Sequence, residues 1–187
     1  MTEPALPRVL TLDLETQRGL DEIQGREDLH RLGLAVAVIH DAATDEITDY
    51  QEHQADLLLK TLWQADLVVG YNLKGFDYPV LEGYSDRPLS SLPTLDLMEE
   101  IAARTGFRVG LDNVASATLG AEKSADGLQA IRWFRDGQLD RVIEYCRRDV
   151  EITRAVYDHG WENGHVLYWD RRRGARVPVP VAWRRPR

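Results

Sequence analysis

The sequence predicts an α/β domain with a mixed β-sheet, because strand-like segments dominate its first half and helix-like segments its second. Short segments rich in apolar and β-branched residues precede about residue 97, and helical patterns follow it. Two strand-like arms around an arginine-rich turn then predict a C-terminal β-hairpin. We therefore expect an α/β domain over residues 1–163 and a basic hairpin or tail over residues 164–187.

The predicted strands are short and mostly apolar. In chain order they lie in VLTLDLETQRG, in LGLAVAVIH and EITDYQEH on either side of the polar turn DAATDE, in DLVVGYN and in LPTLDL. The small and β-branched residues of LGLAVAVI suit a strand that is buried on both faces. We therefore expect this strand to lie in the interior of the protein.

The predicted helices carry apolar residues at helical spacing. They lie in ADLLLKTLWQA, at the opening FDYPVLEGY, and in LMEEIAART, LDNVASATLG, LQAIRWFRDG and LDRVIEYCRRDVEITRAVYDHGWENG. Gly106, Gly120 and Gly137 fit helix ends, and Pro79 fits a first helical turn. Asp96 with Glu99 predicts a helix cap.

Composition and charge exclude several classes of protein. The chain has 187 residues with 43% hydrophobic residues, too many for a disordered chain, and one cysteine, which excludes an internal disulfide framework. It has no apolar run long enough to span a membrane and no signal-peptide pattern, so we expect a soluble cytoplasmic protein.

The charge is divided unevenly along the chain. Seven arginines and one aspartate give residues 164–187 a charge of +6. Because the net charge of the whole chain is −8, residues 1–163 carry a charge of −14. Phosphate contacts need Lys and Arg, so the acidic part alone is a poor non-specific binder of nucleic acid. The basic tail would contact phosphate, dock on the acidic part or bind an acidic partner protein, and the sequence leaves these alternatives open.

The first strand places two carboxylates on one face. Side chains two apart in a strand point to the same side, so Asp13 and Glu15 project together while the leucines around them point to the other side. Two adjacent like charges are unfavourable unless a cation or proton neutralises them. The alternative is a strand end that dips into solvent.

Two further segments add carboxylates. Asp77 follows a buried strand at the opening of a helix, where it either serves a site or only caps that helix. Tyr145 and Asp149 are four apart on a helical pattern and so share a face; the alternative is a core-edge tyrosine beside a surface acid. Four carboxylates on three elements match the charge of two divalent cations, Mg²⁺ or Mn²⁺, which prefer oxygen ligands. None of the five histidines forms a metal-ligand pair.

Taken together, these motifs resemble the DEDD superfamily of 3′–5′ exonucleases, which have a ribonuclease-H-like fold. DLE resembles the first exonuclease motif, YNLKGFDYPVL the second motif as found in proofreading domains of family B DNA polymerases, and YCRRD the third motif in its tyrosine (DEDDy) form. Bacterial stand-alone relatives are also similar. The resemblance covers residues 8–158 and implies a ribonuclease-H-like mixed sheet flanked by helices.

The resemblance also implies site residues and an activity. Asp13, Glu15, Asp77 and Asp149 would hold two metal ions, and Tyr145 would orient the attacking water. Asn72, Lys74 and Arg148 are candidate substrate contacts. The implied activity is metal-dependent hydrolysis of single-stranded DNA or RNA from the 3′ end, which releases nucleoside 5′-monophosphates. The alternative is an inactive ribonuclease-H-like module that binds nucleic acid or serves as a scaffold.

Overall fold

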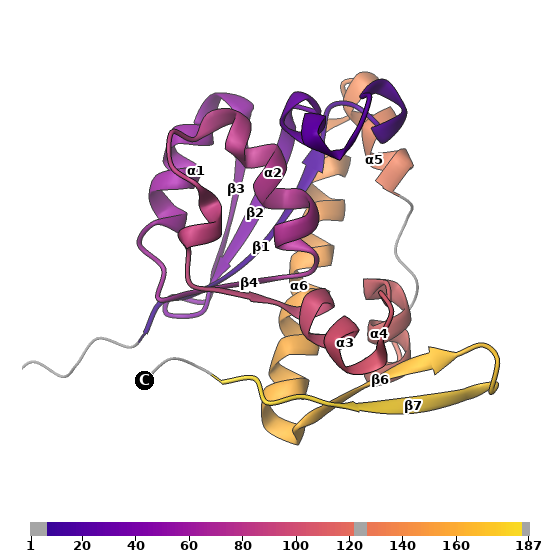
Figure 1. Cartoon of the computed structure of the whole chain (residues 1–187). Helices are drawn as coiled ribbons and strands as arrows, with labels where there is room; N and C mark the ends of the chain where they lie inside the picture. Colours follow the sequence, from indigo (N-terminus) through magenta and orange to yellow (C-terminus); the bar gives the residue numbers. More distant parts are fainter. Residues whose placement is uncertain (1–6, 122–126, 185–187) are drawn as a thin grey trace, which may run out of the picture.

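The computed structural model describes residues 7–121 and 127–184. Its strands are β1 (Val9–Thr16), β2 (Leu34–Asp41), β3 (Glu46–Gln51), β4 (Leu67–Gly70), β5 (Thr94–Asp96), β6 (His165–Asp170) and β7 (Ala175–Pro180). Its α-helices are α1 (Ala55–Leu62), α2 (Tyr78–Leu81), α3 (Leu97–Thr105), α4 (Leu111–Leu119), α5 (Gly127–Arg135) and α6 (Leu139–Asn163). The predicted α/β class, with a mixed sheet and a final hairpin, is confirmed (Figure 1).

The main sheet has five strands in the order β3-β2-β1-β4-β5. The pairs β1–β2 and β2–β3 are antiparallel, whereas β1–β4 and β4–β5 are parallel. Strand β1 is therefore central, and its register with β2 shifts between Glu15 and Thr16. Such irregularities bend a strand and change the direction of a neighbouring side chain.

The two faces of β1 follow the alternation that the sequence predicts. Leu10, Leu12 and Leu14 belong to a buried cluster that also contains residues of α1 and α2. On the opposite face lies α6, whose Cys146 Sγ is 3.3 Å from the backbone oxygen of Asp13. Strand β2 is buried along its whole length, as predicted. One face of β1 thus builds core, and the other faces the middle of α6.

The helix predicted at FDYPVLEGY is shorter than its sequence pattern. A π-helical turn over Leu73–Asp77 precedes the four-residue α2, and a 3₁₀ turn over Glu82–Tyr84 follows it. Pro79 lies in the first turn of α2, as predicted. Wide π turns open the helical ladder and are frequent at functional sites. This turn ends at Asp77 and so sets the position from which the Asp77 side chain projects.

The helix ends follow the glycines. Gly106 and Gly120 have φ angles of 82° and 69° and directly follow α3 and α4, a backbone conformation that a residue with a Cβ atom rarely adopts. Asp96 caps α3, because its carboxylate accepts the N–H groups of Met98 and Glu99. Both predictions are confirmed.

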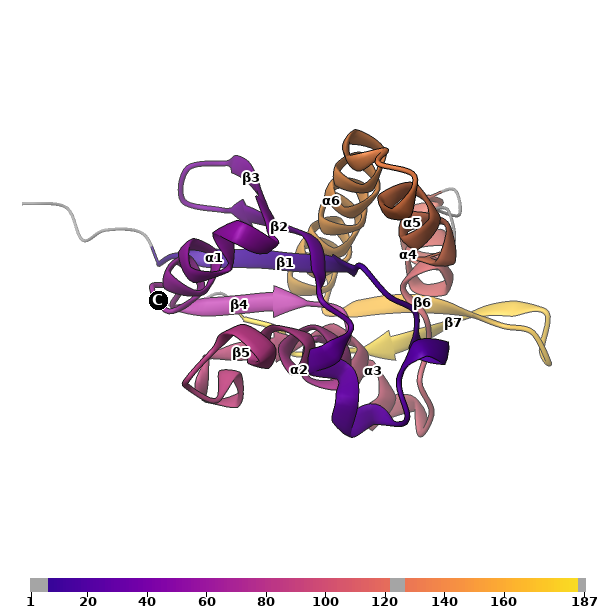
Figure 2. The same cartoon turned by 90° about the horizontal axis from the view of Figure 1, so that it is seen from above.

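The hairpin packs its base on the helices and projects its turn outward. Val166, Tyr168 and Val179 share a buried cluster with residues of α3, α4 and α6. Trp183 lies directly on α6 at Gly160, where a Cβ atom would meet the indole ring at 2.2 Å. Beyond α4 the hairpin extends past the rest of the molecule, on the side toward which β1 points (Figures 1 and 2). The division at residues 163/164 stays a prediction.

Candidate metal centre

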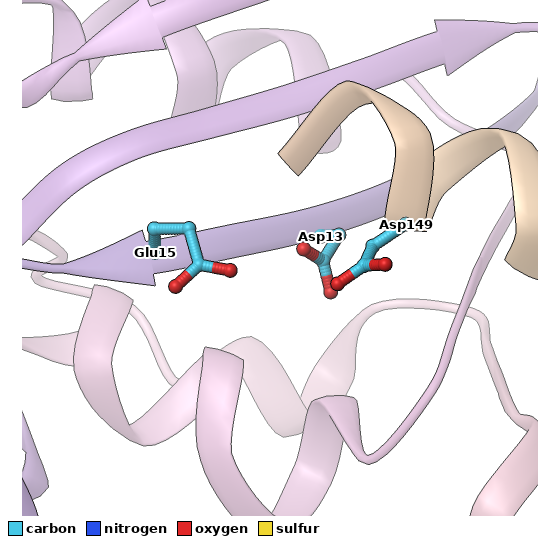
Figure 3. Close-up of side chains that lie close together, drawn as sticks. All are labelled: Asp13, Glu15 and Asp149. Carbon is cyan, nitrogen blue, oxygen red and sulfur yellow. The ribbon is translucent and has the colours of Figure 1, made fainter. Parts of the chain in front are cut away.

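Three carboxylates from β1 and α6 form the centre. One carboxylate oxygen each from Asp13, Glu15 and Asp149 lies within 4.8 Å of the others (Figure 3). Asp13 and Glu15 are neighbours because they share a strand face, and α6 crosses that face with Asp149 pointing toward them. The structure therefore brings together acids that are more than 130 residues apart in sequence.

Asp77 lines the same pocket as Asp13 and Glu15, which is described below. It is only 3% exposed, and its charge is among the causes that raise the pKa of Asp13 and of Glu15. Its side chain makes no capping hydrogen bond to α2, so the alternative of a plain helix cap is not supported. Instead the carboxylate accepts backbone N–H groups, including that of Leu14 on β1.

Burial and mutual repulsion raise the pKa values of these acids. Burial contributes most for Asp13 and Glu15, followed by the neighbouring carboxylates, and both pKa values lie well above the usual range. Burial also raises the pKa of Asp77 to about 8. Among the described residues, no basic side chain is a cause of any of these three shifts.

This chemistry fits divalent cations. Four acids gather here, and hard cations such as Mg²⁺ and Mn²⁺ take carboxylate ligands. A cation would remove the repulsion that now favours the protonated acids. The donor set and its electrostatics thus fit a metal site of Asp13, Glu15, Asp77 and Asp149.

A pocket of about 620 Å³ opens beside the acids. Asp13, Glu15 and Asp77 line it, together with Arg18 and several apolar side chains that we call the apolar wall. That wall includes Leu20, Phe76, Leu128 and Ile131, of which Leu128 and Ile131 come from α5. The sequence reasoning missed this wall, although the apolar residues of α5 recur at helical spacing and predicted its amphipathic face.

Tyr145 lies one helical turn before Asp149 on α6. Its ring packs edge-on against Trp133 of α5, with the ring centroids 6.3 Å apart. Tyr145 is not among the residues that line the pocket. Tyr145 therefore shares α6 with Asp149, and its ring packs against α5.

The three candidate substrate contacts have different surroundings. Asn72 lines the pocket and adopts a left-handed backbone conformation, φ 72°. Lys74 forms an ion pair with Glu99, and Arg148 is exposed on α6. Only Asn72 of these three is part of the pocket wall.

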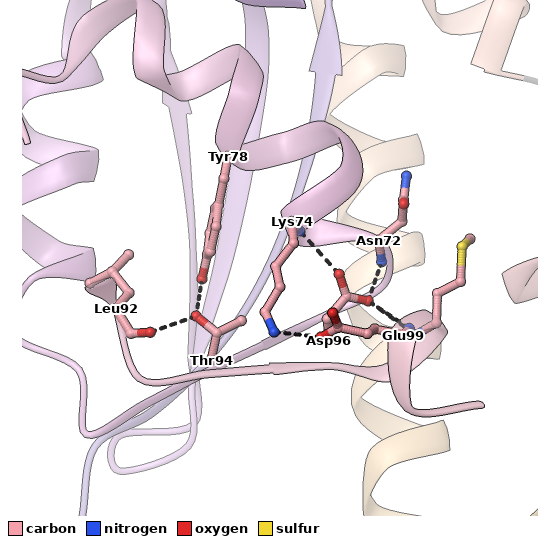
Figure 4. A network of polar contacts seen from close by, with 8 residues as sticks. Asn72, Lys74, Tyr78, Leu92, Thr94, Asp96 and Glu99 are labelled. Atoms are coloured by element: carbon pink, nitrogen blue, oxygen red, sulfur yellow. Dashed lines mark hydrogen bonds and ion pairs between the residues drawn. The ribbon is translucent and has the colours of Figure 1, made fainter. Parts of the chain in front are cut away.

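Asp96 has a larger role than the predicted cap. Its carboxylate accepts the N–H of Asn72 at 2.9 Å and of Lys74 at 3.0 Å, in addition to the two amides at the start of α3 (Figure 4). The hydroxyls of Tyr78 and Thr94, 2.7 Å apart, tie α2 to β5 in the same network. Asp96 thus fastens the turn that carries Asp77 to the sheet.

Cys146 lies behind the centre and is fully buried. Its thiol donates to the backbone oxygen of Asp13, and its Sγ is 3.5 Å from Asp13 Oδ2. Burial, followed by the charge of Asp13, raises the pKa of the Cys146 thiol well above its usual value, so the thiol keeps its proton and acts as a donor. The sequence predicted packing for this residue but not this contact.

Sequence comparison assigns a superfamily to this fold and site. A sequence model described as the RNase H superfamily matches residues 10–161, which is most of the chain. The chain belongs to the RNase H superfamily. No curated protein matches the sequence.

This RNase H superfamily chain is also similar to a solved structure, that of the family B DNA polymerase from the hyperthermophilic archaeon Pyrobaculum calidifontis. The TM-score is 0.62 at 18% sequence identity, over 84% of this chain and 25% of the polymerase chain. The chain thus spans about a quarter of that polymerase. At this identity the likeness concerns the fold, which agrees with the ribonuclease-H-like sheet that the sequence motifs imply.

The sequence predicts no membrane-spanning segment, and the helices of the structure test this prediction. Within residues 7–121 and 127–184, no helix is both long and apolar enough to cross a bilayer.

Proposed function

We propose that this chain is a metal-dependent 3′–5′ exonuclease of the DEDDy type. It would hydrolyse phosphodiester bonds from the 3′ end of single-stranded nucleic acid and release nucleoside 5′-monophosphates. The observation that carries the proposal is the meeting of Asp13, Glu15 and Asp149 within 4.8 Å, with Asp77 facing them at one pocket. Membership of the RNase H superfamily and the order of the three motifs support it.

The four acids would divide between two Mg²⁺ or Mn²⁺ ions. Asp13, Glu15 and Asp149 would hold the first, and Asp13 with Asp77 the second. When bound, such ions supply a reactive water near neutral pH and stabilise the charge on the leaving oxygen. In the net reaction water adds to phosphorus, the bond from phosphorus to the 3′ oxygen breaks, and that oxygen takes up a proton.

The remaining residues position the strand. Tyr145 would orient the attacking water through its hydroxyl, since the usual pKa near 10 makes a tyrosine a poor base at neutral pH. Asn72 would contact the substrate at the pocket, whereas Lys74 and Arg148 would contact phosphates outside it. The side chains of Leu20, Leu128 and Ile131 in the apolar wall carry no hydrogen-bond donors or acceptors. A base that packs against them would not be read by hydrogen bonds, so we expect little preference between bases.

A digestion time course tests this proposal. The substrates are 5′-labelled single-stranded DNA and RNA, each with a free or a blocked 3′ end, incubated with Mg²⁺ or Mn²⁺. We expect a ladder that shortens from the free 3′ end and disappears with the block. The preferred sugar emerges from the same experiment.

The matched variants lie on one helix. Asp149→Ala removes an acid of the centre, whereas Asp140→Ala removes an exposed acid in the first turn of the same α6. We expect activity to be lost in the first variant and kept in the second. Absence of cleavage by the folded wild-type protein with either metal would favour the inactive binding or scaffold module instead.

A further inference from the structure

The turn of the β6–β7 hairpin concentrates positive charge. Four exposed arginines, Arg171, Arg172, Arg173 and Arg176, surround a single acid, Asp170. Residues 1–163, by contrast, carry a charge of −14. We call residues 169–176 the hairpin tip. It presents a cationic surface on an otherwise acidic protein.

Two of the tip arginines, Arg173 and Arg176, contact other residues of the hairpin. Arg173 pairs with Asp170, whose carboxylate also accepts the backbone N–H groups of Arg172 and Arg173. The guanidinium of Arg176 lies 5.1 Å from the ring centroid of Trp169. Two carboxylates lie near the four guanidinium groups, those of Asp170 and of Asp112, which is on α4 and lines the same pocket as Arg171. The tip therefore keeps a net positive charge.

An aromatic side chain accompanies this charge. Trp169 is 39% exposed and lines an open pocket of about 530 Å³ between α4 and the hairpin. Arg171, Asn113 and Ser116 line the same pocket. An exposed indole next to guanidinium groups is the combination on which unpaired bases stack while their phosphates are neutralised.

The tip is held in place by the helices beneath it. Asn113 of α4 donates to the backbone oxygen of Trp169 and accepts its N–H, at 3.2 and 2.6 Å. Thr118 of α4 makes the same double contact with the backbone of Leu167, at 3.0 and 2.8 Å. The arginines are therefore presented on a fixed arm, which lowers the conformational entropy lost when a partner binds.

We propose that the hairpin tip is a second nucleic-acid contact, which binds phosphates and an unpaired base of a strand whose 3′ end lies in the acidic pocket. The proposal rests on the proposed function for the identity of the polymer. The tip adds four guanidinium groups outside the acidic pocket, whose wall includes a single arginine, Arg18, among the described residues. The tip therefore makes binding of long strands depend on residues far from the reacting bond.

Binding without metal isolates the tip from the chemistry. Fluorescence anisotropy measures the Kd of a 5′-labelled single-stranded 30-mer, as DNA and as RNA, in EDTA over a series of KCl concentrations. The variant carries Arg171→Ser, Arg172→Ser and Arg173→Ser. The matched control removes three exposed charges elsewhere, through Arg31→Ser, Lys60→Ser and Arg104→Ser.

The tip variant should bind at least about tenfold more weakly at 50 mM KCl, and its salt slope should fall by about 2, since each phosphate contact on a single strand contributes about 0.7. The control should keep both values near those of the wild-type protein. Equal weakening in the two variants, or no change in the tip variant, would overturn the proposal.

Trp169 tests the stacking component. Trp169→Leu should weaken binding of the single-stranded 30-mer about fivefold or more and leave binding of a fully paired 30-base-pair duplex unchanged, because paired bases are not free to stack. Equal loss on both substrates would remove stacking from the proposal.

Substrate length separates this proposal from the proposed function. With Mn²⁺, the tip variant should raise KM for the 30-mer and leave kcat, and KM for a four-nucleotide strand, unchanged. If no strand is cleaved while the EDTA results hold, the tip proposal stands and the exonuclease proposal fails. If polyglutamate binds to the tip more tightly than the 30-mer, an acidic protein is the partner and the tip proposal is wrong.

Discussion

The carboxylate of Asp96 on β5 and the carboxylates of Asp13 and Glu15 on β1 have opposite surroundings, although all three lie on strands of the same sheet. Asp96, 3% exposed at the end of β5, accepts four backbone N–H groups, from Asn72, Lys74, Met98 and Glu99. The chain itself thus supplies the partners that a buried charge needs.

The acids on β1 lack such a complement. Asp13 faces Asp77, Asp149 and Glu15, and among the described residues the one side chain that donates to it is the thiol of Cys146. The pKa values of Asp13 and Glu15 are therefore raised, because no network of donors stabilises their charged forms. The difference teaches that Asp96 is built for stability, whereas the acidic centre is built for a ligand that carries positive charge.

The largest expected effect is on activity at the acidic centre. Asp13→Asn keeps the side-chain shape but removes the charge, so we expect cleavage to fall at least about 10³-fold, which corresponds to the several kcal/mol that metal-held charge contributes. Single-turnover digestion measures the loss, and circular dichroism checks folding. The exposed Asp86→Asn serves as control, and more than a tenth of the activity remaining in Asp13→Asn would contradict the comparison.

The second effect is on stability at Asp96. Asp96→Ala leaves four amides without their acceptor, so we expect the free energy of unfolding to fall by about 3 kcal/mol in urea denaturation. Asp86→Ala should change it by less than about 0.5 kcal/mol. A small effect at Asp96 would mean that water replaces the carboxylate.

The third effect is a pH dependence of the metal-free protein. The pKa values of Asp13 and Glu15 are raised and that of Asp77 is about 8, so between about pH 4 and pH 8 the folded protein keeps protons that the unfolded chain has released. The free energy of unfolding in EDTA should therefore fall by several kcal/mol as the pH rises through this window, since a pKa difference of one between the folded and unfolded states corresponds to about 1.4 kcal/mol.

Added metal and the Asp13→Asn variant both test the cause of this pH dependence. Mg²⁺ or Mn²⁺ should raise Tm most at pH 8, since the cation binds the deprotonated acids. Asp13→Asn in EDTA should be less sensitive to pH than the wild-type protein. A Tm that rises with pH in the absence of metal would show that the acids are already neutralised by the chain.

The smallest effect concerns Cys146. Cys146→Ala removes the donor to Asp13 and some buried volume, so we expect a loss of about 1 kcal/mol. Cys146→Ser should recover part of it, because the hydroxyl also donates. Thermal unfolding of the two variants in EDTA distinguishes them, and identical Tm values would assign the effect to volume alone.

Much of this arrangement follows from local patterns. The alternation in LTLDLET predicted the two faces of β1, and Gly106 and Gly120 predicted two helix ends, because each pattern reports a periodicity or a backbone conformation of its own residues. The α/β class and the hairpin follow in the same way.

The rest depends on partners that are distant in sequence. Asp96 meets the amides of Asn72 and Lys74 more than 20 residues away, and no local pattern encodes that contact. Lys74, considered as a phosphate contact, pairs with Glu99. The wall that α5 places beside the acids depends likewise on how α5 packs, although its amphipathic face was visible in the sequence.

Helix α6 has a consequence for scale. One continuous helix carries Asp149 near its middle and passes into the hairpin at Gly164. At about 1.5 Å per residue, these two positions are about 22 Å apart along the helix axis. The hairpin tip lies beyond the second position, at the far end of β6. The helix is thus a rigid spacer, so the distance from Asp149 to the base of the hairpin is fixed by the number of residues between them.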